Sequence, residues 1–246
     1  MKIWAHRGCS QQYPENTFTS FSKALEISGL TGIELDIQMT RDGEIVVIHD
    51  ERVDRTTDGI GYVKDYTYSD LRKLAIKTNT GHYEQIPSIQ EVLDLMQDRM
   101  KRGIQLNIEL KNSEIIYDGM EKKILELVVR KNVQNYVVYS SFNAKSLQKI
   151  REMDPDVSIG ILDMRVSDCL NKKNEHIGKN DKKIALHPYW KGIDLSKNML
   201  EGQIVRAWFL GHLYPEKSTG TKLDLAPLEQ KGITDLILNE PEVYIV

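Results

Sequence analysis

The chain has 246 residues, a length that suits one α/β barrel of about 250 residues better than two ordinary domains. Its 33 Lys and Arg residues against 36 Asp and Glu residues give a net charge of -3, so no basic field exists that would bind nucleic acid or an anionic membrane surface. We therefore expect a small-molecule partner and no nucleic-acid partner. No apolar run approaches the ~18 residues of a membrane span and no signal-peptide h-region follows Met1, so we expect a soluble, cytoplasmic protein without stable membrane insertion.

Short runs of strand-forming residues alternate with runs of helical periodicity along the chain. Helices are predicted at residues 16–28, 88–100, 117–132 and 144–153. Strand candidates are found at residues 2–6, 31–37, 103–110, 136–141, 157–162, 183–188, 202–208 and 235–239. This alternation indicates a parallel sheet covered by helices, and eight strands suffice to close a barrel. We therefore predict an α/β fold, a TIM (β/α)8 barrel, with a doubly wound open sheet as the competing architecture.

Residues 51–87 interrupt the alternation with turn residues, tyrosines and one short helical pattern. We interpret this segment as a small insertion after the second strand of the barrel. Loops of this length inside a compact domain are usually functional or separately packed. The insertion is expected at the carboxyl-end rim of the barrel, where it would form a wall over a site.

Acidic side chains gather on two strands that are expected to be neighbours. Glu34 and Asp36 lie two residues apart on one strand, so both leave the same face, and Glu109 and Lys111 repeat this spacing on the next strand of the barrel. Three carboxylates at the same end of adjacent strands form an all-oxygen site that suits Mg²⁺, Ca²⁺ or Mn²⁺. The alternative is that these acids are exposed strand-end residues paired with Lys or Arg.

Two histidines are expected at the same rim, because His6 ends the first strand and His49 ends the run "EIVVIHD". Histidine transfers protons near neutral pH, so two of them across a metal can divide the tasks of base and acid. For either one alone, a structural strand-end histidine is the more common situation. Of the remaining four, we expect none to carry protons and only one to be able to contact the site: His82, His176 and His212 are set aside, and His187 is the exception.

Six stretches of the chain share their order and spacing with one family. They are "HRG" at residue 6, "PENT" at 14, "ELDIQMTRDGEIVVIHD" at 34, "RTTDGIGYV" at 55, "IPSIQEVLDL" at 86 and "LNIELK" at 106. In these residues the chain resembles the glycerophosphodiester phosphodiesterase family, from residue 5 to about residue 112. The resemblance implies a single catalytic TIM barrel over residues 1–246 with the insertion at 51–87. It also implies a divalent metal ion and hydrolysis of glycerophosphodiesters to glycerol 3-phosphate and an alcohol.

The resemblance also implies roles for individual side chains. His6 and His49 would be the acid and base. Arg7 and Lys111 would contact the phosphate, and the metal ligands would be Glu34, Asp36 and Glu109. Glu15 and Asn16 would support them. In physical terms, Pro14 can open a helix at its first turn while the two residues after it turn back toward His6 and Arg7. The alternative for Glu15 is compensation of the dipole at the helix start.

The chain departs from the family pattern on the last two strands. "RAWFLGH" keeps Trp208 but changes Phe209 and Leu210 after it, and "LNEP" places Leu238 and Asn239 where the family tends to have Thr-Asp. We predict that Trp208 offers an apolar face to the glycerol carbons, although a large aromatic residue is as often ordinary packing. The altered wall predicts weak discrimination among alcohol headgroups rather than a different reaction.

Three other functions compete with this interpretation. A phospholipase D-like enzyme that cleaves lysophospholipid or sphingomyelin headgroups would share the same barrel, but it calls for an apolar groove that the sequence does not show. A barrel that only binds ligands would be expected to have lost some of the two histidines and three acids. An aldolase or isomerase would need a Schiff-base or proton-abstraction pattern, which we do not find.

Overall fold

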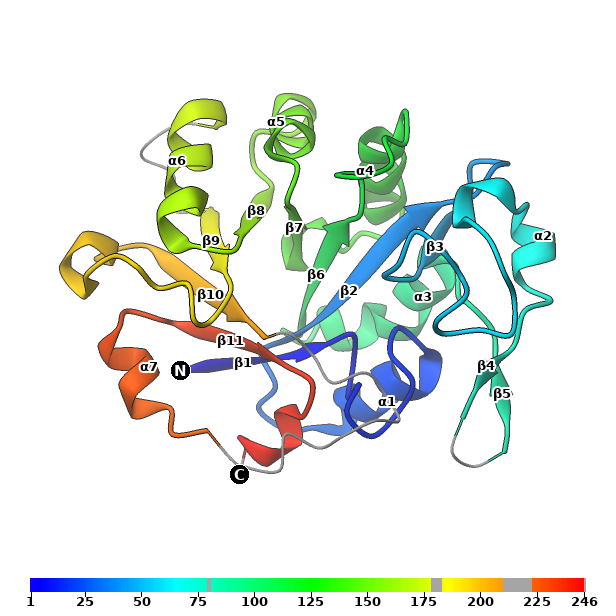
Figure 1. Ribbon diagram of the computed structural model, residues 1–246, viewed down its shortest axis with the longest axis horizontal. Helices are drawn as coiled ribbons and strands as arrows, with labels where there is room; N and C mark the ends of the chain where they lie inside the picture. The colour runs from blue at the N-terminus through cyan, green and yellow to red at the C-terminus, as the bar shows by residue number, and fades with distance from the viewer. Residues whose placement is uncertain (79–80, 178–182, 210–222, 246) are drawn as a thin grey trace.

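Eight parallel strands form a closed barrel in the computed structural model, which describes residues 1–78, 81–177, 183–209 and 223–245 (Figure 1). Strand β1 pairs with both β2 and β11, and this double pairing closes the sheet. The predicted TIM barrel is therefore confirmed and the open sheet is excluded. In chain order the barrel strands are β1 (Lys2–His6), β2 (Gly32–Met39), β6 (Gln105–Leu110), β7 (Val137–Ser141), β8 (Ser158–Asp163), β9 (Ile184–Pro188), β10 (Ile204–Trp208) and β11 (Asp235–Leu238).

Helices lie around the outside of the barrel (Figure 1). They are α1 (Phe18–Glu26), α3 (Ile89–Met100), α4 (Met120–Arg130), α5 (Ala144–Met153), α6 (Val166–His176) and α7 (Ala226–Gln230), with short 3-10 turns η2 (Gln134–Tyr136), η3 (Lys197–Leu200) and η4 (Pro241–Val243). All four predicted helices are present; the first three have slightly shorter bounds than predicted, and α5 has the predicted bounds. Helix α1 is capped by Thr17, so Pro14 lies three residues before the cap and does not open the helix as predicted.

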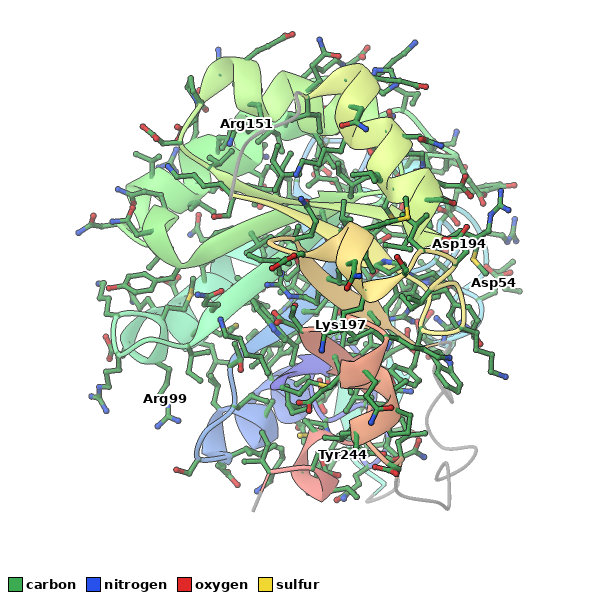
Figure 2. All side chains as sticks on the ribbon, turned by 90° about the vertical axis from the view of Figure 1, so that its left-hand side faces the viewer. Asp54, Arg99, Arg151, Asp194, Lys197 and Tyr244 are labelled. Carbon is green, nitrogen blue, oxygen red and sulfur yellow. The ribbon has the colours of Figure 1, made fainter. Side chains whose placement is uncertain are left out.

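Helix α3 shows how local sequence produces these elements. Ser88 and Glu91 form a capping box, in which each side chain accepts from the other residue's backbone N–H. Apolar residues then recur at helical spacing on one buried face, namely Ile89, Val92, Leu93, Met96 and Met100. The opposite face is polar, and Arg99 at the end of this helix projects from the periphery of the molecule (Figure 2).

The segment after β2 packs as a small unit of its own. Strand β3 (Ile45–Val47) pairs antiparallel with β2, outside the barrel, and is followed by η1 (Val63–Asp65), α2 (Tyr68–Leu71) and a two-stranded ribbon of β4 (Ile76–Lys77) and β5 (Tyr83–Glu84). A separate apolar cluster holds this segment together: Val46, Ile48, Val53, Val63, Leu71, Ile76 and Ile86. The inserted segment at residues 51–87 therefore has its own small core.

The interior of the barrel carries a buried charged group near the amino ends of its strands. The Arg206 guanidinium lies 3.9 Å from the ring centroid of Trp4, and its Nε donates to Asp235 Oδ2 at 3.0 Å. Its Nη1 lies 3.1 Å from His187 Nε2, and burial together with the Arg206 charge holds the pKa of His187 well below its ordinary value. These side chains fill the barrel below the rim. In the described part of the chain, no helix is both long enough and apolar enough to cross a membrane.

Candidate active site

The turn after β1 places a histidine and an arginine at the rim. Arg7 and Gly8 both have left-handed backbone, with φ of 56° and 82°. A Cβ at Gly8 would lie 2.5 Å from Ser20 Oγ, so this position requires glycine. The backbone N–H of Arg7 donates to the Glu34 carbonyl at 2.9 Å, and Ser20 Oγ donates to the Arg7 carbonyl at 3.0 Å. The turn is thus fixed from both sides.

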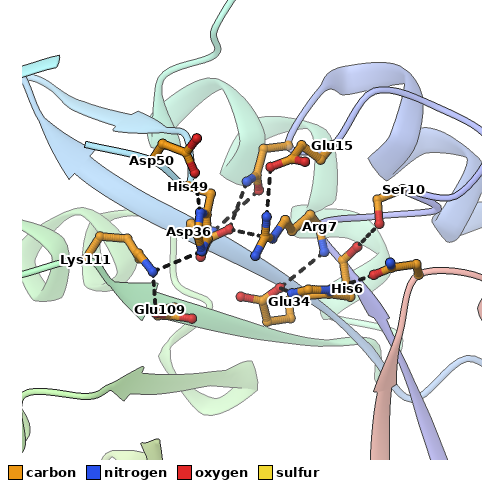
Figure 3. Close-up of polar contacts among 12 residues, drawn as sticks. His6, Arg7, Ser10, Glu15, Glu34, Asp36, His49, Asp50, Glu109 and Lys111 are labelled. Atoms are coloured by element: carbon orange, nitrogen blue, oxygen red, sulfur yellow. Dashed lines mark hydrogen bonds and ion pairs between the residues drawn. The ribbon is translucent and has the colours of Figure 1, made fainter. Parts of the chain in front are cut away.

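Glu34, Asp36 and Glu109 meet at one point on the neighbouring strands β2 and β6 (Figure 3). Asp36 and Glu109 are register partners, and one oxygen from each of the three acids lies within 4.8 Å of the others. All three are buried, with exposed fractions of 3%, 0% and 9%, so they are not the exposed strand-end acids of the alternative reading.

The electrostatics of this acidic triad favour a cation. Burial and the charges of Asp36 and Glu109 raise the pKa of Glu34 well above its ordinary value. Burial acts in the same direction on Asp36, but Arg7, His49 and Lys111 lower its pKa overall. Among the described residues, Glu34 Oε1 and Asp36 Oδ1 have no hydrogen-bond partner. Buried carboxylate oxygens without partners are costly unless a cation coordinates them, so the donor set fits a hard divalent metal ion.

His6 is held by the opposite end of the chain. Its Nδ1 donates to Asn239 Oδ1 at 2.6 Å, which leaves Nε2 unprotonated and 3.8 Å from Glu34 Oε2. Burial, and then the nearby Arg7 charge, lower the pKa of His6 to about 3. The imidazole is therefore neutral, with its lone pair directed toward the acidic triad.

His49 lies on the other side of the triad, in the segment after β3. Its Nδ1 is 2.6 Å from Asp50 Oδ1, and its Nε2 is 3.1 Å from Lys111 Nζ (Figure 3). Lys111 Nζ also donates to Glu109 Oε1 at 3.0 Å. Because an ammonium group only donates, Nε2 accepts and Nδ1 carries the proton toward Asp50. Glu109 and Asp36 raise the pKa of Lys111 although burial lowers it, so this group stays charged.

The residues of the "PENT" turn support this constellation. Asn16 Nδ2 donates to Asp36 Oδ2 at 2.9 Å, and Glu15 Oε1 accepts from Arg7 Nη1 at 2.8 Å. Arg7 Nε lies 3.1 Å from Asp36 Oδ2 as an ion pair. Glu15 lies outside helix α1, so its contacts are with arginines and not with the helix start.

A cavity of about 310 Å³ opens over these groups, with one polar and one apolar side. Trp208 lines it and stands edge-on to Phe142, with ring centroids 6.0 Å apart. The polar side is lined by His6, Arg7, Glu34, His49, Asp50, Arg55, Asn107, Glu109, Lys111 and Ser140, and the apolar side by Phe142, Leu162, Trp208, Phe209 and Ile237. Of these apolar residues, the sequence analysis predicts Trp208 and names Phe209, but it does not anticipate Phe142, Leu162 or Ile237.

Two expectations about the far wall need correction. Leu238 is buried in the layer between barrel and helices, and it is not among the described residues that line the cavity. Asn239 contacts His6 instead of forming a wall beside a headgroup. Phe209 does line the cavity, and Leu210 lies outside the described residues.

The other histidines have different surroundings. His187 is not among the described residues of the cavity wall, and its carbonyl accepts from the Trp208 indole N–H at 3.1 Å, so it reaches the site only through that residue. His176 ends α6, and His82 is an exposed residue directly before β5. His212 lies outside the described residues.

The sequence analysis missed the contacts that Asp50, Asn239 and Arg55 make in the site. Asp50 contacts His49, Asn239 contacts His6, and Arg55 from the inserted segment bonds both Glu15 and Asp50. Asp50 directly follows His49, and Arg55 lies in the "RTTDGIGYV" stretch, so both positions were visible in the motifs. Nothing in the sequence placed Asn239 beside a residue 233 positions away.

The closed parallel barrel, with two histidines and a buried all-oxygen acidic triad that could hold a divalent metal ion at its carboxyl-end rim, is an arrangement that suits a hydrolase of phosphate esters. The model of the glycerophosphoryl diester phosphodiesterase family matches residues 6–181, and the chain belongs to that family. The expected family and the expected class of enzyme, a phosphoric diester hydrolase, are thereby confirmed.

Individual relatives agree with this assignment. The chain is 35% identical over 246 residues to a glycerophosphodiester phosphodiesterase of Caldanaerobacter subterraneus subsp. tengcongensis, which covers 99% of this chain and 96% of the relative. It is 38% identical over 204 residues to a glycerophosphodiester phosphodiesterase of Bacillus altitudinis, and this alignment covers 81% of this chain and 80% of the relative. A solved glycerophosphodiester phosphodiesterase of Agrobacterium tumefaciens superposes with a TM-score of 0.77 at 22% identity, over 100% and 99% of the chains, and supports the fold.

Proposed function

We propose that this enzyme hydrolyses glycerophosphodiesters to glycerol 3-phosphate and an alcohol, in a reaction that depends on a divalent metal ion and two histidines. The observation that carries the proposal is the buried triad of Glu34, Asp36 and Glu109, of which Glu34 and Glu109 line one cavity together with His6 and His49. A solved phosphodiesterase of Oleispira antarctica with the same fold, at a TM-score of 0.75, contains the product sn-glycerol-3-phosphate. This relative supports the choice of product.

The triad would hold Mg²⁺, Ca²⁺ or Mn²⁺, because all of its donors are carboxylate oxygens. When bound, such an ion would neutralise negative charge on the phosphoryl oxygens and so favour attack at phosphorus and departure of the alcohol oxygen. Arg7 and Lys111 line the same cavity and would bind the anionic phosphodiester beside the triad. Both remain charged in this environment, since each is paired with a carboxylate of the site.

The histidines differ in a way that suggests their roles. His6 presents an unprotonated Nε2, because Asn239 Oδ1 fixes the proton on Nδ1. It would accept the proton of the attacking oxygen. The Asp50 carboxylate beside His49 Nδ1 would stabilise the positive charge that arises when Nε2 takes up a proton from solvent, and His49 in that form would protonate the leaving oxygen. The attacking oxygen belongs either to water or to the neighbouring glycerol hydroxyl. Attack by the hydroxyl would give a cyclic phosphate, which is then hydrolysed.

Trp208 and the apolar side of the cavity would contact the carbon atoms of the substrate. Glu15 and Asn16 would hold Arg7 and Asp36 in place. We propose that residues 1–246 act as one catalytic domain, with the inserted segment 51–87 contributing Arg55 to the cavity wall. A cytoplasmic location stays a prediction of the sequence.

The test is a product analysis with glycerophosphocholine as substrate and added Mn²⁺ or Mg²⁺. We expect stoichiometric glycerol 3-phosphate and choline, and no phosphocholine, because the proposed cleavage separates phosphorus from the headgroup alcohol. Release of glycerol and phosphocholine would contradict the proposed bond. Running the reaction in H₂¹⁸O and stopping it at low conversion distinguishes the two attacking oxygens. Attack by the glycerol hydroxyl gives a cyclic phosphate without ¹⁸O, whereas direct attack by water gives glycerol 3-phosphate that carries ¹⁸O.

A further inference from the structure

The polar residues of the site form one continuous chain of hydrogen bonds and ion pairs. It begins at Asp36, passes through Arg7, Glu15, Arg55, Asp50, His49 and Lys111, and ends at Glu109. Each neighbouring pair in this chain lies 2.6–3.1 Å apart. Both ends are members of the acidic triad. Every other member lies on β2, on β6 or in a loop that directly follows a strand, and Arg55 alone comes from the inserted segment at residues 51–87.

Arg55 joins the two halves of this chain through four charge-assisted hydrogen bonds. Toward Asp50, its Nε donates to Oδ2 at 2.6 Å and its Nη2 to Oδ1 at 2.9 Å. Toward Glu15, its Nη1 donates to Oε2 at 2.8 Å and its Nη2 to Oε1 at 2.8 Å. A planar guanidinium can serve two carboxylates in this way, whereas the ammonium group of lysine cannot reproduce the fork.

The two carboxylates that Arg55 holds are the ones that orient functional side chains. Asp50 accepts from His49 Nδ1, and Glu15 accepts from Arg7 Nη1. Glu15 is buried, and burial alone would raise its pKa, but Arg7 and Arg55 lower the pKa to about 2. Without Arg55, Asp50 would lose two of its hydrogen bonds and Glu15 would keep only Arg7, so both acceptors would be free to turn.

We propose that Arg55 is a positioning residue, through which the inserted segment holds His49 and Arg7 in their working orientations by way of Asp50 and Glu15. The proposal rests on the proposed function, since it assumes that His49 and Arg7 act on the substrate. It assigns to the inserted segment a part in catalysis that goes beyond covering the cavity.

Kinetics with glycerophosphocholine and saturating Mn²⁺ test the proposal. We expect Arg55→Ala to lower kcat by about 10–100-fold while KM changes less than about threefold, because outer residues that orient a metal site typically have effects of this size. Arg55→Lys should also lose at least about fivefold in kcat, since it keeps the charge but not the fork. The matched control is Arg52→Ala, which removes an arginine of the same segment that pairs with Asp54 and is 44% exposed. Its kcat should stay within about twofold of the wild type.

A kcat of Arg55→Ala within twofold of the wild type would overturn the proposal. So would a large rise in KM at unchanged kcat, because that result would make Arg55 a direct substrate contact. An equal loss in Arg52→Ala would show that the segment, and not this guanidinium, is responsible. If Arg55→Ala does not fold, the Arg55→Lys variant alone decides between these outcomes.

A second measurement does not depend on turnover. Imidazole ¹⁵N spectra of the metal-free protein should show His49 with one protonated and one unprotonated nitrogen, and the signals are assigned with a His49→Asn variant. In Arg55→Ala the two signals should move toward each other as the tautomers exchange, and in Arg52→Ala they should not move. Failure of the wild type to release glycerol 3-phosphate would refute the proposed function. Unchanged His49 signals in Arg55→Ala would refute the positioning role.

Discussion

Replacing Glu34 by Gln should make the metal-free protein more stable and the enzyme inactive. At the 4.8 Å limit that bounds the triad, two unit charges repel by about 3.5 kcal/mol at an effective dielectric constant of about 20. Asp36 and Glu109 each act on Glu34 in this way, and the Arg7 charge offsets part of the repulsion. The amide keeps an acceptor for the Arg7 backbone N–H, which lies 3.2 Å from Glu34 Oε2, and it can donate to a neighbouring carboxylate. We therefore expect a net gain of about 2 kcal/mol.

Thermal unfolding with chelator and with Mn²⁺ measures this gain. For a chain of this size, about 2 kcal/mol corresponds to a rise in Tm of ~4–8 °C in chelator. Added Mn²⁺ should then stabilise the wild type by about 2.7 kcal/mol at 100 times Kd, and Glu34→Gln much less. The control is Glu126→Gln, a change of the same charge at an exposed ion pair with Lys122, which should stay within about 0.5 kcal/mol of the wild type. A lower Tm for Glu34→Gln in chelator, or equal stabilisation of both proteins by Mn²⁺, would refute the reasoning.

Three further predictions concern the histidines, pH and the headgroup. His6→Ala and His49→Ala should each lower kcat by roughly 10²–10⁴ with the fold kept, and His176→Ala should change it little; near wild-type turnover of both variants would contradict their roles. Because the fold raises the pKa of Glu34 above its ordinary 4.5, this group favours folding below pH 4.5 and that contribution is lost as pH rises through the folded pKa. The stability advantage of Glu34→Gln in chelator should accordingly grow from pH 4 upward in denaturant titrations, and a constant advantage would argue against the shift. The kcat/KM values for glycerophosphocholine, glycerophosphoethanolamine and glycerophosphoglycerol should lie within about tenfold, or ~1.4 kcal/mol, and a hundredfold preference would exclude an undiscriminating pocket.

The acidic triad could be predicted from the sequence because strand periodicity determines it. Glu34 and Asp36 are two residues apart, so they share a face, and parallel pairing of adjacent strands brings Glu109 beside them. The same periodicity, applied to the last strand, corrects Leu238. Ile237 lines the cavity, so its neighbour Leu238 points to the helical layer, and the prediction that the consecutive residues Leu238 and Asn239 both form the wall is inconsistent with a period of two.

The contacts of Asn239 and Arg55 could not be predicted in this way. Asn239 reaches His6 only because β11 closes the barrel against β1, and the position of the last strand depends on all those before it. Arg55 belongs to a segment whose path is set by its own apolar cluster and not by strand periodicity. Family motifs marked Arg55 as part of a pattern, but only the packed structure shows which two carboxylates it joins.

The central claim is that the triad holds a divalent ion on which phosphodiester hydrolysis depends. The most direct measurement is a titration of the chelated, dialysed enzyme with Mn²⁺, in which bound ion and glycerol 3-phosphate release from glycerophosphocholine are followed together. We predict that turnover starts at background and rises in proportion to bound Mn²⁺, and that both saturate together; hard oxygen donors should allow Mg²⁺ or Ca²⁺ to bind at the same site. Full turnover in the chelated enzyme before any Mn²⁺ is added would contradict the claim.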